Sequence, residues 1–224
     1  AKLFLKDAIK ELEKENTFVL RISDYNTSGL SDPYTQSNDP FNFSFDGWNA
    51  LIKIDGGANK GDDKAGAFGI GKSAPFSNSY YRLIFYRTYN QKYERAAQGI
   101  SRLMSYQNGA LMTSGIGYYG EAEGNNPVEA IPELDSINKR LKIGTDVFIY
   151  GFKSTSNWET EITVALLENF LISFYYGQLR VKVQGREINK KSLSRYVERI
   201  HRERPGATKG TYGNYLALTR KEGV

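Results

Sequence analysis

The part of the chain that most restricts its possible folds is the glycine-rich segment at residues 66–73, Gly-Ala-Phe-Gly-Ile-Gly-Lys-Ser. It satisfies two phosphate-binding patterns at once, GxxxxGK[ST] and GxxGxG. Both patterns use glycine because backbone N–H groups without a neighbouring Cβ can approach phosphate oxygens closely. A helix that begins just after the loop would add the positive end of its dipole, and Lys72 would add a full charge.

The residues before this segment separate the two patterns. A GxxxxGK[ST] loop should follow a buried hydrophobic strand, but residues 57–65 read Gly-Ala-Asn-Lys-Gly-Asp-Asp-Lys-Ala. There is also no convincing later run of four apolar residues ending in an acidic residue for magnesium, since Asp146 precedes its apolar run. The GxxGxG interpretation is therefore favoured, and a P-loop NTPase or a glycine turn without a ligand are the alternatives.

Hydrophobic periodicity predicts helices and strands without a regular strand–helix–strand alternation. We expect helices at residues 3–15, 48–52, 158–175 and 192–204, and strands at residues 17–23, 80–88, 98–106, 146–152 and 179–183. Residues 24–45 and 108–131 are expected to be loops. One face of the helix at residues 158–175 is expected to hold Ile162, Ala165, Leu166, Asn169, Phe170 and Ser173. The mixture predicts an α+β layered sandwich rather than a doubly wound sheet.

Composition excludes several classes of site. The chain has no cysteine, which excludes disulfides and thiolate metal sites, and its only histidine, His201, argues against a zinc site built by the protein. The longest apolar stretch, residues 163–177, contains Glu168 and Asn169 and is too short and too polar to span a bilayer. No signal peptide pattern is visible. We expect a soluble, cytoplasmic protein without a membrane partner.

The net charge of +5 is concentrated late in the chain. The basic residues there are Lys190, Lys191, Arg195, Arg199, Arg202 and Arg204. They form either a solvated helix face or a surface that contacts nucleic acid, and the sequence leaves both interpretations open.

Three segments, in this order, resemble the nucleotide site of the GHKL ATPases, the superfamily of gyrase, MutL, MORC proteins and heat-shock chaperones. The first, residues 24–30, reads Asp-Tyr-Asn-Thr-Ser-Gly-Leu. It resembles the family's DxGxG segment, which implies that Asp24 accepts a hydrogen bond from the adenine amino group. Asn26 stands where a glycine is usual and Gly29 comes one residue late, but Asn tolerates a left-handed backbone. An Asx turn that closes the strand is the alternative role for Asp24.

The second segment contains Gly66, Gly69 and Gly71, and the glycine-rich stretch before it resembles the family's lid. Lys72 and Ser73 would then meet the triphosphate. The third segment, Gly144-Thr145, resembles the family's Gly-Thr pair, whose threonine hydroxyl supports the water network around the base. The resemblance is closest to bacterial MORC-like ATP-binding proteins, which often occur beside restriction or phage-defence genes.

The resemblance implies a two-layer α/β sandwich of the GHKL (Bergerat) type with a mixed, mostly antiparallel sheet. It also implies ATP and Mg²⁺ as ligands, and hydrolysis that acts as a switch for homodimerisation or for a partner protein. In the family, a preceding helix carries a glutamate that activates water and, four residues later, an asparagine that holds Mg²⁺. The helix at residues 3–15 has no such pair, so we expect that helix upstream, and we assign no catalytic residue and no metal ligand.

The same reasoning divides the chain into an ATP-binding domain at residues 1–155, incomplete at its N-terminus, and a helix–strand–basic helix segment at residues 156–224. The second segment could begin a transducer-like region. Two other functions stay open: a nucleotide-responsive module that binds nucleic acid through the basic helix without turnover, and a P-loop NTPase.

Overall fold

The chain divides into two compact units, Ala1–Lys153 and Ser154–Val224. The computed structural model describes residues 2–35, 47–53 and 71–220, so Gly66 and Gly69 lie outside the described residues. The predicted boundary, between residues 155 and 156, falls in the connection after the last strand of the first unit. Among the described residues, no helix combines the length and the apolar character needed to cross a bilayer.

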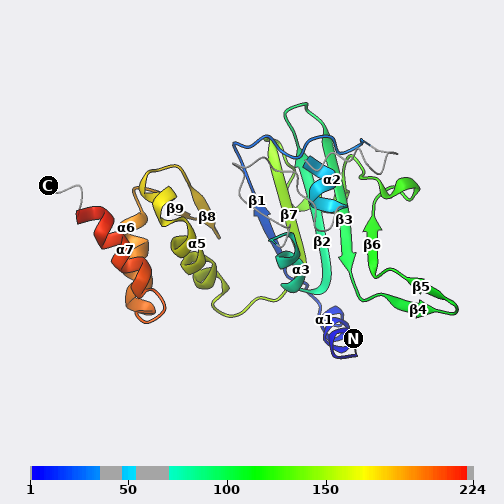
Figure 1. Ribbon diagram of the computed structural model, residues 1–224, viewed down its shortest axis with the longest axis horizontal. Coiled ribbons are helices and arrows are strands. Elements are labelled where there is room, and N and C mark those ends of the chain that lie inside the picture. The colour runs from blue at the N-terminus through cyan, green and yellow to red at the C-terminus, as the bar shows by residue number, and fades with distance from the viewer. Residues whose placement is uncertain (1, 36–46, 54–70, 221–224) are drawn as a thin grey trace. The chain divides into compact units, whose positions relative to one another are not determined.

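A five-stranded sheet forms the centre of the first unit (Figure 1). Its order is β1 (Val19–Ser23), β7 (Gly144–Phe152), β2 (Ser79–Tyr89), β3 (Arg95–Arg102) and β6 (Ile116–Tyr119). The α+β class is confirmed. Every described pair of neighbouring strands is antiparallel. The prediction of a mixed sheet is therefore not met in this part of the chain.

Both faces of the sheet are covered by short helices. On one face, α2 (Gly47–Ile52) and α3 (Ala74–Ser77) bury Trp48 and Phe76 against Tyr86 and Ile149. On the other, α4 (Pro132–Ile137) buries Leu134 against Phe148. The two clusters take alternate residues of β7, as the pleat of a strand requires. The first unit also contains α1 (Lys2–Leu12), which contacts β2, a 3-10 turn at residues 71–73 and the 3-10 turn η2 (Glu123–Asn125).

A ribbon of two short strands, β4 (Tyr106–Asn108) and β5 (Leu111–Thr113), extends from the β3–β6 edge (Figure 1). The prediction of one long loop at residues 108–131 is therefore wrong, because this region contains β5 and β6. The strand predicted at residues 98–106 instead covers residues 95–102 and stops before β4. Strands of three or four residues are too short for alternation of side chains to reveal them.

The second unit consists of α5 (Trp158–Tyr175), β8 (Val181–Val183), β9 (Arg186–Ile188), α6 (Leu193–Glu203) and α7 (Lys209–Arg220). The bounds of α5 agree with the prediction, and Gln184 and Gly185 turn the β8–β9 hairpin with φ of 46° and 75°. In α5 the structure buries a different set of residues from the six that the sequence places on one face. Its buried residues are Thr163, Val164, Leu167, Leu171, Phe174 and Tyr175. Apolar residues surround most of α5, and its backbone leaves helical geometry at Phe170 (φ −126°), so periodicity alone did not identify the face.

Candidate nucleotide site

Asp24 and Thr145 lie side by side at the end of two neighbouring strands. The backbone N–H of Asp24 donates to the carbonyl of Thr145 at 3.0 Å, and the backbone N–H of Thr145 donates to Oδ1 of Asp24. In a regular antiparallel pair the second bond would go to the backbone carbonyl of residue 24. The Asp24 side chain takes that place, so the first and third motifs of the sequence meet at one end of β1 and β7.

The loop after Asp24 has the backbone that the sequence led us to expect. Asn26 and Gly29 both have left-handed φ, 60° and 69°. Thr27 donates from its hydroxyl to Oδ2 of Asp24 at 3.2 Å. A Cβ on Gly29 would stand 2.6 Å from the carbonyl oxygen of Tyr89, so only glycine lets this loop lie against the end of β2.

A buried network of charged side chains lies behind Asp24. Arg140 donates from Nη1 to Oδ1 of Asp146 at 2.6 Å, and its Nη2 donates to the carbonyl of Asp24. Arg87 binds the other oxygen of Asp146 and also donates to Asp135 at 2.7 Å. The side chains of Arg87, Arg140 and Asp146 are each at most 5% exposed. The network therefore fixes the backbone of Asp24 through Arg140, while 47% of the Asp24 side chain remains exposed to solvent.

Gly144 makes this arrangement possible. Its φ is +139°, and a Cβ would stand 2.0 Å from Nη2 of Arg140 and 2.5 Å from the carbonyl oxygen of Asp24. Any side chain would separate Arg140 from Asp24. Gly144 thus has a packing role that the sequence did not predict.

Asp146 is not available to a metal ion. Both of its carboxylate oxygens accept hydrogen bonds from arginine, and a cation would have to displace two positive charges. Within residues 2–35, 47–53 and 71–220, no group of three His, Asp or Glu side chains is arranged to hold a metal. The described residues therefore do not fit a metal site built by protein ligands.

The described end of the glycine motif lies against α2. Lys72 donates from Nζ to the carbonyl oxygen of Ala50 at 3.3 Å. A Cβ on Gly71 would meet nothing within 4 Å, and the side chain of Ser73 makes no capping hydrogen bond to α3. The helix expected after the loop has only four residues, so its dipole adds little to anion binding, contrary to the prediction.

The two parts of the candidate site belong to opposite ends of β2. Thr88 pairs with Thr145 at one end, and Ser79, six residues after Ser73, pairs with Phe152 at the other. Helix α2 contacts both parts. The backbone N–H of Trp48 donates to the carbonyl oxygen of Ser31 at 3.0 Å, and the carbonyl oxygen of Ala50 accepts a hydrogen bond from Lys72. Thus Asp24, Asn26, Gly29 and Thr145 come together, and Lys72 and Ser73 are placed beside α2.

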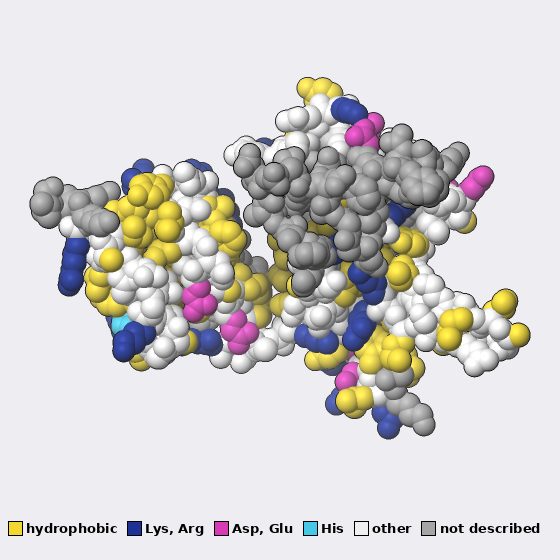
Figure 2. Space-filling model, in the orientation of Figure 1, with side chains coloured by type: hydrophobic (Ala, Val, Ile, Leu, Met, Phe, Trp, Pro, Cys, Tyr) yellow, Lys and Arg dark blue, Asp and Glu magenta, His cyan; other side chains and the backbone are white. Residues whose placement is uncertain are grey.

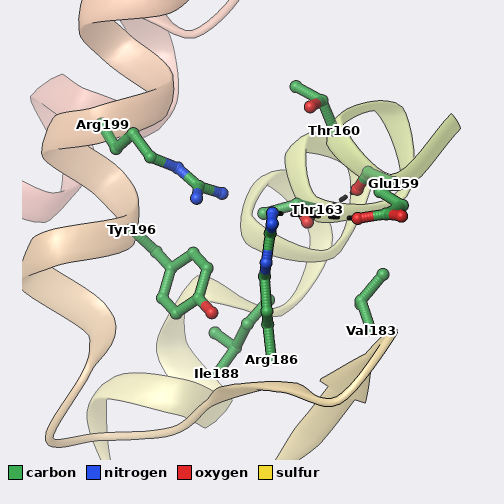
Figure 3. Close-up of a pocket in the computed structure, with 8 residues that line it drawn as sticks. All are labelled: Glu159, Thr160, Thr163, Val183, Arg186, Ile188, Tyr196 and Arg199. Carbon is green, nitrogen blue, oxygen red and sulfur yellow. Dashed lines mark hydrogen bonds and ion pairs between the residues drawn. The ribbon is translucent and has the colours of Figure 1, made fainter. Parts of the chain in front are cut away.

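The second unit contains a small cavity between α5, the β8–β9 hairpin and α6 (Figure 3). Arg186 and Arg199 both point toward it, and Arg186 lies 3.8 Å from the carboxylate of Glu159. Its volume of about 10 Å³ is enough for a single water molecule. A nucleotide cannot enter this cavity.

Sequence reasoning missed Arg87, Arg140 and Asp135. Arg87 lies 48 positions before Asp135, and Arg140 lies 116 positions after Asp24, whose carbonyl it binds, so no local pattern marks these contacts. Comparisons of the chain with protein-family models, with curated proteins and with solved structures find no match.

Proposed function

We propose that the first unit binds ATP, with adenine at Asp24 and Thr145, in a site of the GHKL type. The observation that carries the proposal is the fixed, half-exposed carboxylate of Asp24. One oxygen is held by the Thr145 N–H, and the carboxylate remains open to solvent. The exocyclic amino group of a bound base would add a charge-assisted hydrogen bond to a carboxylate whose Oδ1 already accepts from the Thr145 N–H and whose Oδ2 accepts from the Thr27 hydroxyl, and this added bond would favour adenine over a base that lacks the donor.

The phosphates would bind to the glycine motif. In this proposal the backbone of Gly66, Gly69 and Gly71 and the side chains of Lys72 and Ser73 contact the phosphate oxygens. Mg²⁺ would bind together with the phosphates, and none of the described residues is assigned as its ligand.

The antiparallel sheet supports this site over a P-loop. A P-loop connects a strand to a full helix in a parallel sheet, whereas here every described strand pair is antiparallel and Ser73 precedes a helix of four residues. The charge pattern of helix α6 adds no support to the nucleic-acid alternative. On the exposed side of the helix, the acidic Glu198 and Glu203 alternate with the basic Arg195 and Arg202.

Beyond binding, the proposal follows the family resemblance. ATP hydrolysis would act as a conformational switch for a homodimer or a partner protein, in a bacterial DNA-related or phage-defence system. No residue of this chain is assigned as the catalytic base.

Calorimetric titration with a non-hydrolysable ATP analogue and Mg²⁺ tests the site, wild type against Asp24→Asn. The asparagine keeps an oxygen that can accept from the Thr145 N–H, but it removes the negative charge that would accept a hydrogen bond from the adenine amino group. We expect the affinity to fall about 10- to 100-fold, the worth of a hydrogen bond to a charged group. The inosine analogue, with a carbonyl in place of the amino group, should bind weakly to the wild type and gain relative to the ATP analogue in Asp24→Asn.

Asp32→Asn is the matched control. Asp32 lies in the same connection and is exposed, and its side chain pairs with Lys92 at 2.5 Å. This variant should bind the ATP analogue as the wild type does. Equal binding by Asp24→Asn and the wild type, or no binding by the wild type, would contradict the proposal.

A further inference from the structure

The ribbon formed by residues 103–115, here called the arm, extends from the sheet beyond β3 and β6. The N–H of Leu103 donates to the carbonyl of Gly115 at 2.7 Å and joins the arm to the sheet. No charged residue occurs at positions 103–120, although a quarter of the whole chain is charged. This is therefore an uncharged surface on a charged protein.

Large apolar side chains of the arm are exposed to solvent. The exposed fractions are 63% for Met104, 57% for Tyr106, 75% for Leu111 and 76% for Met112, and Figure 2 shows hydrophobic side chains at the tip of the ribbon. In the strand register, Asn108 is opposite Leu111 and Gln107 is opposite Met112, so Leu111 and Met112 point to opposite faces. A two-stranded ribbon with both faces in water is only marginally stable, so the arm gains from a surface that covers it.

The strand next to the arm forms one edge of the sheet in the part of the chain that the structure describes. β6, the last strand of the described sheet, reads Ile-Gly-Tyr-Tyr and carries neither a charge nor a proline. The opposite edge, β1, carries the exposed Arg21, the kind of residue that discourages pairing with another strand. Among the described strands, one edge of the sheet thus carries a charge that discourages pairing and the other edge carries none.

We propose that the arm and β6 are the contact surface for a second copy of this chain. Two copies with a net charge of +5 repel each other, and residues 103–120 let them meet without juxtaposed like charges. Antiparallel pairing of one β6 with another places the same residues on both sides of a two-fold axis, the usual geometry of a homodimer. An anionic membrane is a poorer partner, because the arm has no Lys or Arg to attract it.

Methionine is the natural probe of this surface. The chain has two methionines, Met104 and Met112, and both lie on the arm. In protein labelled with ¹³C at the methionine methyl groups, NMR therefore shows two methyl signals that report directly on the arm. We expect both signals to shift or broaden as the protein is concentrated from micromolar to millimolar, in step with dimer formation seen by sedimentation. The experiment needs no nucleotide, so its outcome does not depend on the proposed ATP site.

Leu111→Glu should abolish the concentration dependence, since it adds a negative charge to the proposed contact surface of each copy, and Met112→Glu should do the same from the other face. Leu141→Glu is the control, because Leu141 is 72% exposed and lies outside the arm, and it should associate as the wild type does. The proposal is overturned if the wild type stays monomeric at all concentrations, if it dimerises while the methyl signals stay unchanged, or if Leu111→Glu and Leu141→Glu have equal effects.

Discussion

Arg87 and Asp146 are direct partners in the register of β2 and β7, and the guanidinium donates to one carboxylate oxygen twice, from Nε at 2.9 Å and from Nη2 at 2.6 Å. Arg140 takes the other oxygen. Burial of charge is costly unless each group is paired and hydrogen-bonded. Here the pairing extends outward to the backbone of Asp24, so the core of the sheet and the candidate base site share one network.

Removing one partner of this network should strongly destabilise the first unit. Arg87→Met leaves Asp146 buried with a single arginine, and we expect a loss of about 3–5 kcal/mol in the free energy of unfolding. Urea unfolding measures it in a Trp158→Phe background, in which Trp48 is the only tryptophan and reports on the first unit alone.

Asp32→Asn is again the control, because it breaks an exposed ion pair with Lys92 and should leave stability nearly unchanged. A loss in Arg87→Met no larger than in this control would show that the network contributes specificity rather than stability.

Gly144→Ala should both destabilise the first unit and weaken nucleotide binding. Its Cβ would collide with Nη2 of Arg140 and the carbonyl of Asp24, at a φ of +139°. Overpacking and backbone strain together should cost about 2–5 kcal/mol. Gly109→Ala isolates the strain, since Gly109 has φ +61° and open space around it, and about 1–2 kcal/mol is expected. Equal losses of stability in the two variants by urea unfolding would argue against the crowding at Gly144.

Much of the fold was predictable where a single element carries its own pattern. β2 and β7 alternate or run apolar over nine residues or more, and α5 is a largely apolar segment of 18 residues, so their positions follow from local sequence. β5 and β6 exist only through their partners β4 and β3. Their pairing is decided by the approach of distant segments, which local propensity does not encode.

The candidate site divides in the same way. The turn at Asn26 and Gly29 was predictable, because residue type restricts φ. The resemblance assigned Asp24 and Thr145 to the same base site, but it did not predict the hydrogen bonds between them. Arg140 could not be identified, because its role depends on the carbonyl of a residue 116 positions earlier.

Tyr86 should make stability depend on alkaline pH. Burial raises the pKa of its phenol to about 12, and the positive charge of Arg102 acts in the opposite direction. Below pH 10 the phenol is protonated in the folded and the unfolded chain. Between pH 10 and about 12 only the unfolded chain releases the proton, so stability falls with rising pH by roughly 1.4 kcal/mol per unit from this group.

Tyr86→Phe should remove that part of the slope. Urea unfolding of both proteins at several pH values in this window checks it, and the difference between their phenolate absorbance titrations gives the pKa directly. Parallel pH profiles, or a difference titration centred near pH 10, would contradict the prediction.

The second unit should fold by itself, because its core is made of its own residues. Leu167, Phe174, Ile188 and Ile200 are all fully buried in one cluster of this unit. A fragment of residues 154–224 should therefore unfold cooperatively in urea, followed by the fluorescence of Trp158. Leu167→Ala should cost about 2–5 kcal/mol, because it opens a cavity in that cluster. Ile172→Ala, on the same helix but with 60% of Ile172 exposed, should cost much less. A fragment without a cooperative transition, or equal effects of the two substitutions, would mean that the core of this unit is not self-sufficient.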